Sequence, residues 1–284
     1  MSSEVLRKKS ILMPLVSTDW LFNNINNVKI IDSSWHLPNQ KRNAYKEYVD
    51  EHIINSIFFD IDKNSNQETN LPHMLPKINE WENIVSNLGI SNKDKIIVYD
   101  NSDLISSCRC WYTFLYFGHN PSLISVLDGG LKKWKQEGKS VVNTVTVTSK
   151  TNYEAKENKN MVKSKIEIDK NISLKKFKVI DARSIERFEG KVDEPRSNVR
   201  SGSIEGSSCL PFIQLINKNN NTFKSRKDIN LIFKKIINTQ HNNVVFSCGS
   251  GVTASVLALA YFLINNKYIP TIYDGSWSEY GLIK

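Results

Sequence analysis

The stretch VVFSCGSGVTASVLAL, from Val244 to Leu259, decides how the chain is organised around Cys248. An apolar, β-branched run predicts a buried strand that ends at the cysteine. The apolar residues beyond the two glycines predict a helix that begins near Val252. The glycines allow a tight turn with successive N–H groups on one side, and the helix start adds the positive end of its dipole. Such a loop favours a reactive thiolate, whereas the alternative is a small buried cysteine without chemistry.

Length and composition are those of a globular protein with room for two domains. The chain has 284 residues, of which 40% are hydrophobic and 24% charged, and its formal net charge is +9. The basic residues are mostly lysines scattered among asparagines, so we expect no nucleic-acid partner. No apolar run reaches the roughly 18–20 residues of a membrane span, and the longest, Val252–Ile264, predicts a buried helix.

The cysteines and the N-terminal segment bear on the compartment. Four cysteines lack the spacing of a disulfide framework, which favours a reducing environment. The segment 1–21 has a basic patch and a short apolar stretch, as a signal peptide would. However, Pro14 interrupts it, and Ser17, Thr18 and Asp19 predict a helix cap. We therefore expect a cytoplasmic protein with no membrane association.

Three segments recur at nearly one spacing along the chain. The pairs are VKIIDSSW (28–35) with FKVIDARS (177–184), DKIIVYDNSD (94–103) with NNVVFSCGSG (242–251), and LISVLDGGLKKW (123–134) with IPTIYDGSWSEY (269–280). The matched positions lie 149, 148 and 146 residues apart. The chain is therefore predicted to be two copies of one domain.

Short β-branched runs alternate with helical patterns in each copy, which predicts an α/β fold with a parallel sheet flanked by helices in each domain. We expect a first domain over 1–137, a linker over 138–165 and a second domain over 166–284. Parallel sheets bind ligands beyond the carboxyl ends of their strands. Cys248 stands at such an end, and Asp100 stands at the equivalent place, so one half is expected to be active and the other inert.

Longer motifs make the pattern specific. The loop CGSGVT at 248–253 resembles the signature of the two-domain rhodanese superfamily, and within it that of the 3-mercaptopyruvate sulfurtransferases. The likeness extends to FFDID, HMLP, LDGGLKKW, DEPR and YDGSWSEYG, and covers the chain from about Val16 to Gly281. Thiosulfate sulfurtransferases are similar but carry basic residues after the cysteine, where this chain has Gly249 and Ser250. The resemblance implies tandem rhodanese-like domains.

The resemblance also implies roles for individual residues. Cys248 matches the nucleophile that accepts sulfur, and Ser250, His73 and Asp62 match a proposed Ser-His-Asp relay beside it. Without the resemblance, His73 would be a hydrogen-bonded loop residue and Asp62 a turn residue.

Substrate binding is assigned in the same way. Arg187 and Arg196 match a pair that grips the substrate carboxylate and ketone, and a planar guanidinium suits a carboxylate because it bonds both oxygens. Surface ion pairing is the alternative for both arginines. The other substrate-binding positions are those of the loop: Gly249, Gly251, Val252 and Thr253.

The expected reaction transfers sulfur from 3-mercaptopyruvate through a cysteine persulfide to cyanide, a thiol or a thioredoxin-type protein, and releases pyruvate. The alternatives are thiosulfate sulfurtransfer to cyanide and an inactive rhodanese-like binding module. No cofactor and no metal are expected.

Other cysteine chemistry fits the sequence less well. A cysteine-dependent phosphatase needs an arginine six positions after the cysteine, a spacing of Cys-x5-Arg, and the residue at that position is Ala254. Cys108 and Cys110 are too closely spaced for a usual zinc pair and are expected to pack in the core. Cys209 is also expected in the core.

Overall fold

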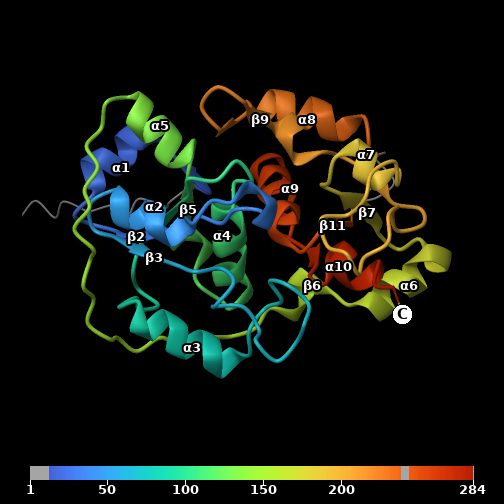
Figure 1. Ribbon diagram of the computed structural model, residues 1–284, viewed down its shortest axis with the longest axis horizontal. Coiled ribbons are helices and arrows are strands. Elements are labelled where there is room, and N and C mark those ends of the chain that lie inside the picture. Colours follow the sequence, from blue (N-terminus) through green and yellow to red (C-terminus); the bar gives the residue numbers. More distant parts are fainter. Residues whose placement is uncertain (1–12, 238–242, 284) are drawn as a thin grey trace, which may run out of the picture.

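The computed structural model describes residues 13–237 and 243–283, and it contains two five-stranded parallel sheets (Figure 1). The first sheet has the order β1-β5-β4-β2-β3. Its strands are β1 (Leu15–Val16), β2 (Lys29–Asp32), β3 (Ser56–Phe58), β4 (Ile96–Tyr99) and β5 (Ile124–Leu127). The second sheet has the order β6-β12-β11-β7-β8. Its strands are β6 (Val162–Lys163), β7 (Lys178–Asp181), β8 (Ser208–Cys209), β11 (Val244–Ser247) and β12 (Ile272–Tyr273).

The two sheets are the same strand for strand, which confirms the predicted duplication. β2, β4 and β5 of the first half correspond to β7, β11 and β12 of the second, as the repeated segments require. A short antiparallel hairpin, β9 (Ile216–Asn217) with β10 (Thr222–Phe223), lies outside both sheets.

Helices cover both faces of each sheet. The first half contains α1 (Thr18–Asn24), α2 (Ala44–Asp50), α3 (Ile78–Asn87), α4 (Ser107–Tyr116) and α5 (Gly130–Gln136). The second half contains α6 (Lys165–Leu174), α7 (Ile185–Phe188), α8 (Arg226–Lys234), α9 (Val252–Ile264) and α10 (Ser276–Tyr280). Consecutive residues of β2 point to opposite faces: Ile30 packs in the cluster that contains Trp134 of α5, and Ile31 packs in the cluster that contains Phe114 of α4.

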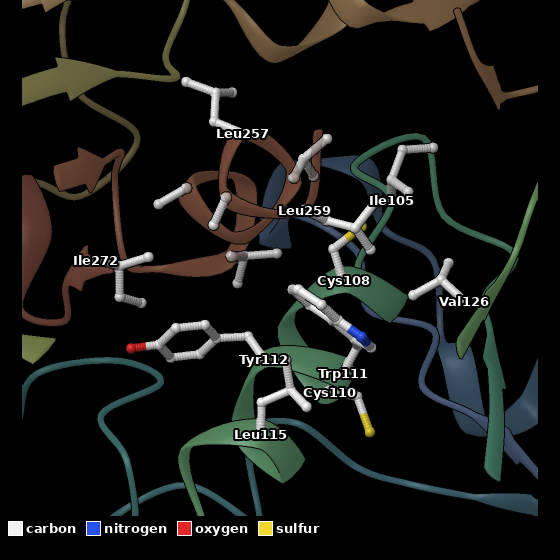
Figure 2. Packing of buried hydrophobic residues seen from close by; sticks show 14 of the residues in the cluster. Ile105, Cys108, Cys110, Trp111, Tyr112, Leu115, Val126, Leu257, Leu259 and Ile272 are labelled. Carbon is white, nitrogen blue, oxygen red and sulfur yellow. The ribbon is translucent and has the colours of Figure 1, made fainter. Parts of the chain in front are cut away.

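The two halves meet along α4 and α9, which lie side by side in the middle of the molecule (Figure 1). Cys108 and Trp111 of α4 and Leu259 of α9 belong to one buried cluster (Figure 2). Each fully buried side chain of this size contributes about 1.5–3 kcal/mol. The predicted buried helix is therefore correct, with the bounds Val252–Ile264.

The cysteines differ in burial. All four are free; Cys108 and Cys110 are buried, as expected. Cys209 is only half-buried, so its expected place in the core is wrong: it ends β8, which pairs with β7 alone and forms an edge of the sheet.

The structure describes part of the N-terminal segment and all of the expected linker. Ser17 caps α1 and accepts a hydrogen bond from the N–H of Trp20 at 3.1 Å, as expected of a helix cap. Positions 1–12 of the N-terminal segment 1–21 lie outside the described residues. The expected linker, 138–165, includes β6, which pairs with β12 in the second sheet. Among the described residues, no helix is both long enough and apolar enough to span a membrane.

Candidate active site

Cys248 directly follows β11 at the carboxyl edge of the second sheet, and the residue is only 2% exposed. Gly251 precedes α9 with a φ of +83°, a left-handed conformation that favours glycine. Within residues 13–237 and 243–283, the backbone N–H groups of 249–253 donate to no backbone acceptor. Unpartnered N–H groups at a helix start can bind an anion or a charged sulfur.

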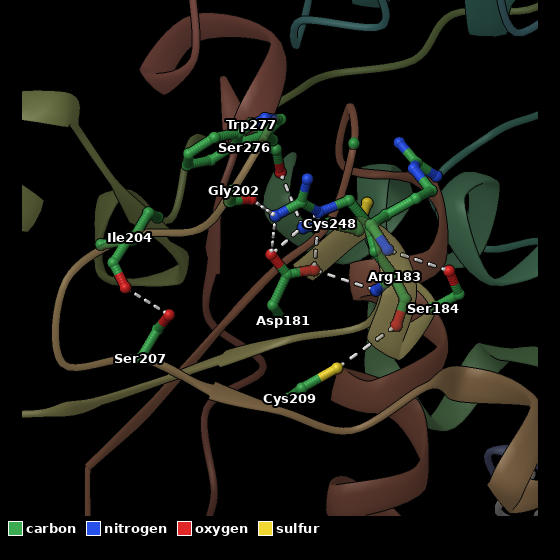
Figure 3. A network of polar contacts seen from close by, with 12 residues as sticks. Asp181, Arg183, Ser184, Gly202, Ile204, Ser207, Cys209, Cys248, Ser276 and Trp277 are labelled. Atoms are coloured by element: carbon green, nitrogen blue, oxygen red, sulfur yellow. Dashed lines mark hydrogen bonds and ion pairs between the residues drawn. The ribbon is translucent and has the colours of Figure 1, made fainter. Parts of the chain in front are cut away.

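The segment after β12 holds this loop in place. The N–H of Cys248 donates to the hydroxyl of Ser276 at 3.2 Å (Figure 3). In return, the N–H of Trp277 donates to the carbonyl of Cys248 at 2.9 Å, and the N–H of Ser278 donates to the carbonyl of Gly249 at 2.8 Å. Because the carbonyls of Cys248 and Gly249 accept hydrogen bonds from this segment, the loop backbone has a defined conformation before any substrate binds.

The residues of the expected relay lie in contact, although they come from both domains. His73 Nδ1 is 2.9 Å from Ser250 Oγ, and His73 Nε2 is 2.9 Å from Asp62 Oδ1. Trp35 Nε1–H donates to the other oxygen of Asp62 at 2.9 Å. Ser250 and His73 are buried, whereas the side chain of Asp62 is 64% exposed. The geometry joins the loop hydroxyl to a carboxylate near the surface.

Burial lowers the pKa of His73; the hydrogen bond and charge of Asp62 oppose this shift, and the charges of Arg109 and Arg196 add to it. Burial raises the pKa of Asp62, but its contacts with His73 and Trp35 outweigh that effect, so its pKa lies below the usual value. A neutral imidazole beside a carboxylate holds its proton on Nε2. Nδ1 is then an acceptor for the Ser250 hydroxyl.

Arg187 already has a partner. Arg187 Nε donates to Glu194 Oε1 at 3.1 Å, and Nη2 donates to the second oxygen of Glu194. Glu194 also accepts from Arg183, which in turn pairs with Asp181 at the end of β7 (Figure 3 shows the latter pair). A Cβ atom at Gly249 would lie 3.2 Å from Arg187 Nη2, so the guanidinium packs against the Cys248 loop. The alternative of an ion pair therefore holds for one edge of the Arg187 guanidinium, the edge that faces Glu194.

Arg196 differs from Arg187 in its contacts. Within the described part of the chain, its guanidinium makes no hydrogen bond to a protein acceptor and no ion pair. Burial lowers the pKa of Arg196; the charges of Cys248, Glu194 and Asp62 oppose this, and that of Arg187 adds to it. Arg196 is therefore a half-buried cation close to the thiol, with its donors available to a substrate anion.

Sequence reasoning misses Glu194, Ser276 and Arg109, which support the site. The signal for Glu194 is present in DEPR, where an acid stands two positions before Arg196. Ser276 lies within a repeated segment, but its contact with Cys248 is not visible from spacing. The remaining predicted loop residues lie at the start of α9, where Val252 is buried and Thr253 is half-buried. No group of three metal-ligating side chains that could hold an ion lies within residues 13–237 and 243–283.

The rhodanese-like domain family matches the chain twice, over residues 17–137 and 164–282. The chain therefore belongs to the rhodanese family, and each match contains four strands of one sheet, all but the edge strand β1 or β6 that directly precedes it.

Similar proteins include several sulfurtransferases. The mitochondrial thiosulfate/3-mercaptopyruvate sulfurtransferase 1 of Arabidopsis thaliana is 35% identical over 94% of this chain and 76% of its own length. The 3-mercaptopyruvate sulfurtransferase of Mus musculus is 33% identical, and the thiosulfate sulfurtransferase of Rattus norvegicus is 34% identical; both matches cover 94% of this chain and 91% of the relative. The crystal structure of SseA from Escherichia coli, described as a 3-mercaptopyruvate sulfotransferase, superposes with a TM-score of 0.84 at 30% identity. It covers 94% of this chain and 99% of that one.

Proposed function

We propose that the protein is a 3-mercaptopyruvate sulfurtransferase that carries sulfur as a persulfide on Cys248. The carboxylate of 3-mercaptopyruvate binds Arg196, with Arg187 beside it. The observation that carries the proposal is the hydrogen bond between His73 and Ser250, which brings a proton relay from the first domain to the Cys248 loop of the second.

The first half-reaction makes the persulfide. The Cys248 thiolate attacks the substrate sulfur, a sulfur–sulfur bond forms, and the carbon–sulfur bond breaks. The electron pair of that bond stays on carbon as the enolate of pyruvate. The substrate thiol gives up its proton through Ser250 to the free Nδ1 of His73, and this proton returns through Ser250 to the enolate carbon, so that pyruvate leaves while the persulfide keeps the negative charge. Unpartnered N–H groups of 249–253 stabilise the charge on the outer sulfur.

The second half-reaction restores the enzyme. A nucleophilic acceptor, which is cyanide, a small thiol or a thioredoxin-type protein, attacks the outer sulfur. The sulfur–sulfur bond breaks and its electron pair returns to Cys248 as the thiolate. Cyanide thereby becomes thiocyanate, and a thiol becomes a persulfide.

Thiosulfate sulfurtransferase is the second candidate, because relatives of both names are about equally similar to the chain. The loop argues for mercaptopyruvate. Thiosulfate is a dianion that needs positive charge beside the nucleophile, whereas Gly249 and Ser250 bring no charged side chain to the loop.

The test compares initial rates with 3-mercaptopyruvate and with thiosulfate, using cyanide as acceptor. We expect kcat/KM to be at least about tenfold higher for mercaptopyruvate, equivalent to about 1.4 kcal/mol of transition-state binding. Cys248→Ser is the control and should lose turnover with both donors while its circular dichroism is unchanged. A higher kcat/KM with thiosulfate would establish the second candidate, and no turnover with either donor would favour a binding module.

We also propose a division of labour and a compartment. The second domain, 166–284, is the catalytic half, and the first, 1–137, supplies Asp62 and His73 across the linker 138–165. Four free cysteines favour the cytoplasm. A fluorescent fusion of the whole chain would test this location, and import into mitochondria, the compartment in the name of the Arabidopsis relative, would contradict it.

A further inference from the structure

Arg109 of α4 is a buried cation that the proposed reaction leaves unused. The residue is 3% exposed, and its Nη2 donates to Asp274 Oδ1 at 2.8 Å and to the backbone carbonyl of His73. Asp274 directly follows β12 in the other domain and is 4% exposed. The pair is therefore a buried ion pair between the two halves.

The same ion pair holds the chain on both sides of His73. The second oxygen of Asp274 accepts the N–H of Leu75 at 2.9 Å, while Arg109 takes the carbonyl of His73. His73 has a φ of +60°, a left-handed conformation that is unfavourable for a residue with a side chain. Such a conformation persists only where the surroundings hold it. Here the holding groups are Arg109 and Asp274.

Arg109 also contacts the Cys248 loop. A Cβ atom at Gly251 would lie 2.7 Å from Arg109 Nη1, so the guanidinium packs directly against the backbone of this glycine. Ser250, the partner of His73, is the neighbouring residue. One guanidinium thus touches both segments that meet in the 2.9 Å contact between His73 and Ser250.

The duplicated fold contains an internal comparison. On the inert side, Asp128 corresponds to Asp274, and its Oδ1 accepts the N–H of Phe223 at 2.8 Å, the counterpart of Leu75 at a spacing of 148 positions. The counterpart of Arg109 at this spacing is Leu257, which is fully buried in α9. Docking of the halves therefore uses an aspartate and an N–H on both sides. The arginine is present only on the side of Cys248.

We propose that Arg109 is a positioning residue for sulfur transfer: paired with Asp274, it fixes the His73 segment against the Cys248 loop so that His73 meets Ser250. This inference rests on the proposed function, because it assigns Arg109 to the relay of that reaction. Arg109 acts through His73 and does not touch the reacting atoms.

The test is a double-mutant cycle that removes the ion pair with and without His73. The variant Arg109→Leu/Asp274→Asn removes both charges together, so no lone buried charge remains to unfold the protein. In the wild-type background we expect the single-turnover rate constant for persulfide formation to fall at least about tenfold at saturating 3-mercaptopyruvate. In a His73→Ala background the same pair of changes should alter this rate constant by less than about twofold, because the relay is already lost.

Two further variants complete the design. Asp128→Asn changes the matched aspartate on the inert side and should leave the rate constant within about twofold of wild type. Arg109→Lys keeps the buried charge on a shorter side chain and should lower the rate constant in part. This variant replaces the neutral pair in the test if the neutral pair does not fold. The inference is overturned if the neutral pair keeps the wild-type rate constant, if it loses the same factor in both backgrounds, or if Asp128→Asn loses as much.

Failure of the inference can be separated from failure of the proposed function. If wild type uses thiosulfate rather than 3-mercaptopyruvate, the donor is wrong, and the same cycle is then measured with thiosulfate. If wild type uses 3-mercaptopyruvate through Cys248 and the cycle shows no coupling, only the role of Arg109 is wrong.

Discussion

The two arginines of the candidate site differ in how free they are to bind a substrate. Glu194 occupies one edge of Arg187, so binding an anion there must compete with a bidentate carboxylate. Arg196 has no such partner among the described residues. A hydrogen bond to a charged group contributes about 1.5–3 kcal/mol, so the free guanidinium should dominate the binding of the substrate carboxylate.

We therefore expect Arg196→Met to raise KM for 3-mercaptopyruvate by about 10–100-fold, and Arg187→Met to raise it less. Steady-state kinetics on both variants measure the difference. Arg200→Met is a matched control, because it removes an exposed arginine of the same domain that packs over Trp277. Equal KM values for the two site variants would show that Glu194 does not restrain Arg187.

The relay should also show a characteristic pH dependence. Since burial lowers the pKa of His73, the imidazole is still neutral, and able to accept a proton, at pH values below about 6.5, where a free histidine becomes charged. The charged groups that act on it are Asp62, Arg109 and Arg196, and only the carboxylate raises its pKa. Asp62→Asn should therefore move the acid limb of the rate of persulfide formation to lower pH and reduce the plateau.

Pre-steady-state rates across pH 4–8 measure this limb in wild type and Asp62→Asn. Alkylation of Cys248 by iodoacetamide, measured over the same range, reports ionisation of the thiol separately. A limb that moves to higher pH in Asp62→Asn would contradict the assigned interaction between the two side chains.

At the scale of elements, the two strand–loop–helix units show why one copy is active. In the second domain, α9 begins four residues after Cys248, and the intervening loop contains two glycines. In the first domain, α4 begins seven residues after Asp100, whose carboxylate accepts the N–H groups of Ser102 at 2.8 Å and Ser107 at 2.9 Å. The first-domain carboxylate thus consumes N–H groups that a bound sulfur would need.

Placing a cysteine in the first loop should not create a second site. In Asp100→Cys/Cys248→Ser we expect no persulfide at position 100 after exposure to 3-mercaptopyruvate, because the loop lacks the paired glycines. Mass spectrometry of the peptide that carries position 100 provides the measurement, and wild type treated in parallel provides the positive control. A persulfide at position 100 would show that the glycine loop is not required.

At the scale of the whole molecule, the halves are joined by the buried cluster along α4 and α9 and by two aspartates related by the duplication. Asp274 has a cationic partner, whereas among the described residues the hydrogen-bond partner of the Asp128 carboxylate across the interface is the N–H of Phe223. Burial raises the pKa of Asp128 to about 6, although the contacts with Phe223 and Lys133 oppose the shift. An ionised Asp128 is therefore a cost to the folded protein.

The sign of the pH effect follows from this shift. The folded pKa of Asp128 is above the unfolded one, so the carboxyl favours folding below about pH 4, and this advantage is lost as the pH rises through about 6. Asp128→Asn, which keeps an oxygen for Phe223, should raise the free energy of unfolding by up to about 3 kcal/mol at pH 8 and by little at pH 4. Urea unfolding at both pH values tests this, and an equal change at the two would refute it.

The sequence alone determined the features that depend on local spacing. The alternation of β-branched runs with helical patterns defined the fold class, and the recurrence of three segments defined the duplication. The strand, the glycine loop and the helix around Cys248 followed from one stretch, because turns and helix starts are set by neighbouring residues. His73 and Asp62 could be named only through a resemblance, since nothing in their own surroundings marks them.

The tertiary structure decided which distant groups meet. His73 and Ser250 are 177 positions apart, and Arg109 and Asp274 are 165 apart; they come together only because α4 packs on α9. The burial of Asp128 and the pairing of Arg187 with Glu194 also depend on how loops fold over the sheet edge. Hydrogen bonds and charges act over a few ångströms, so their partners are fixed by packing between elements and domains, which no local pattern of residues encodes.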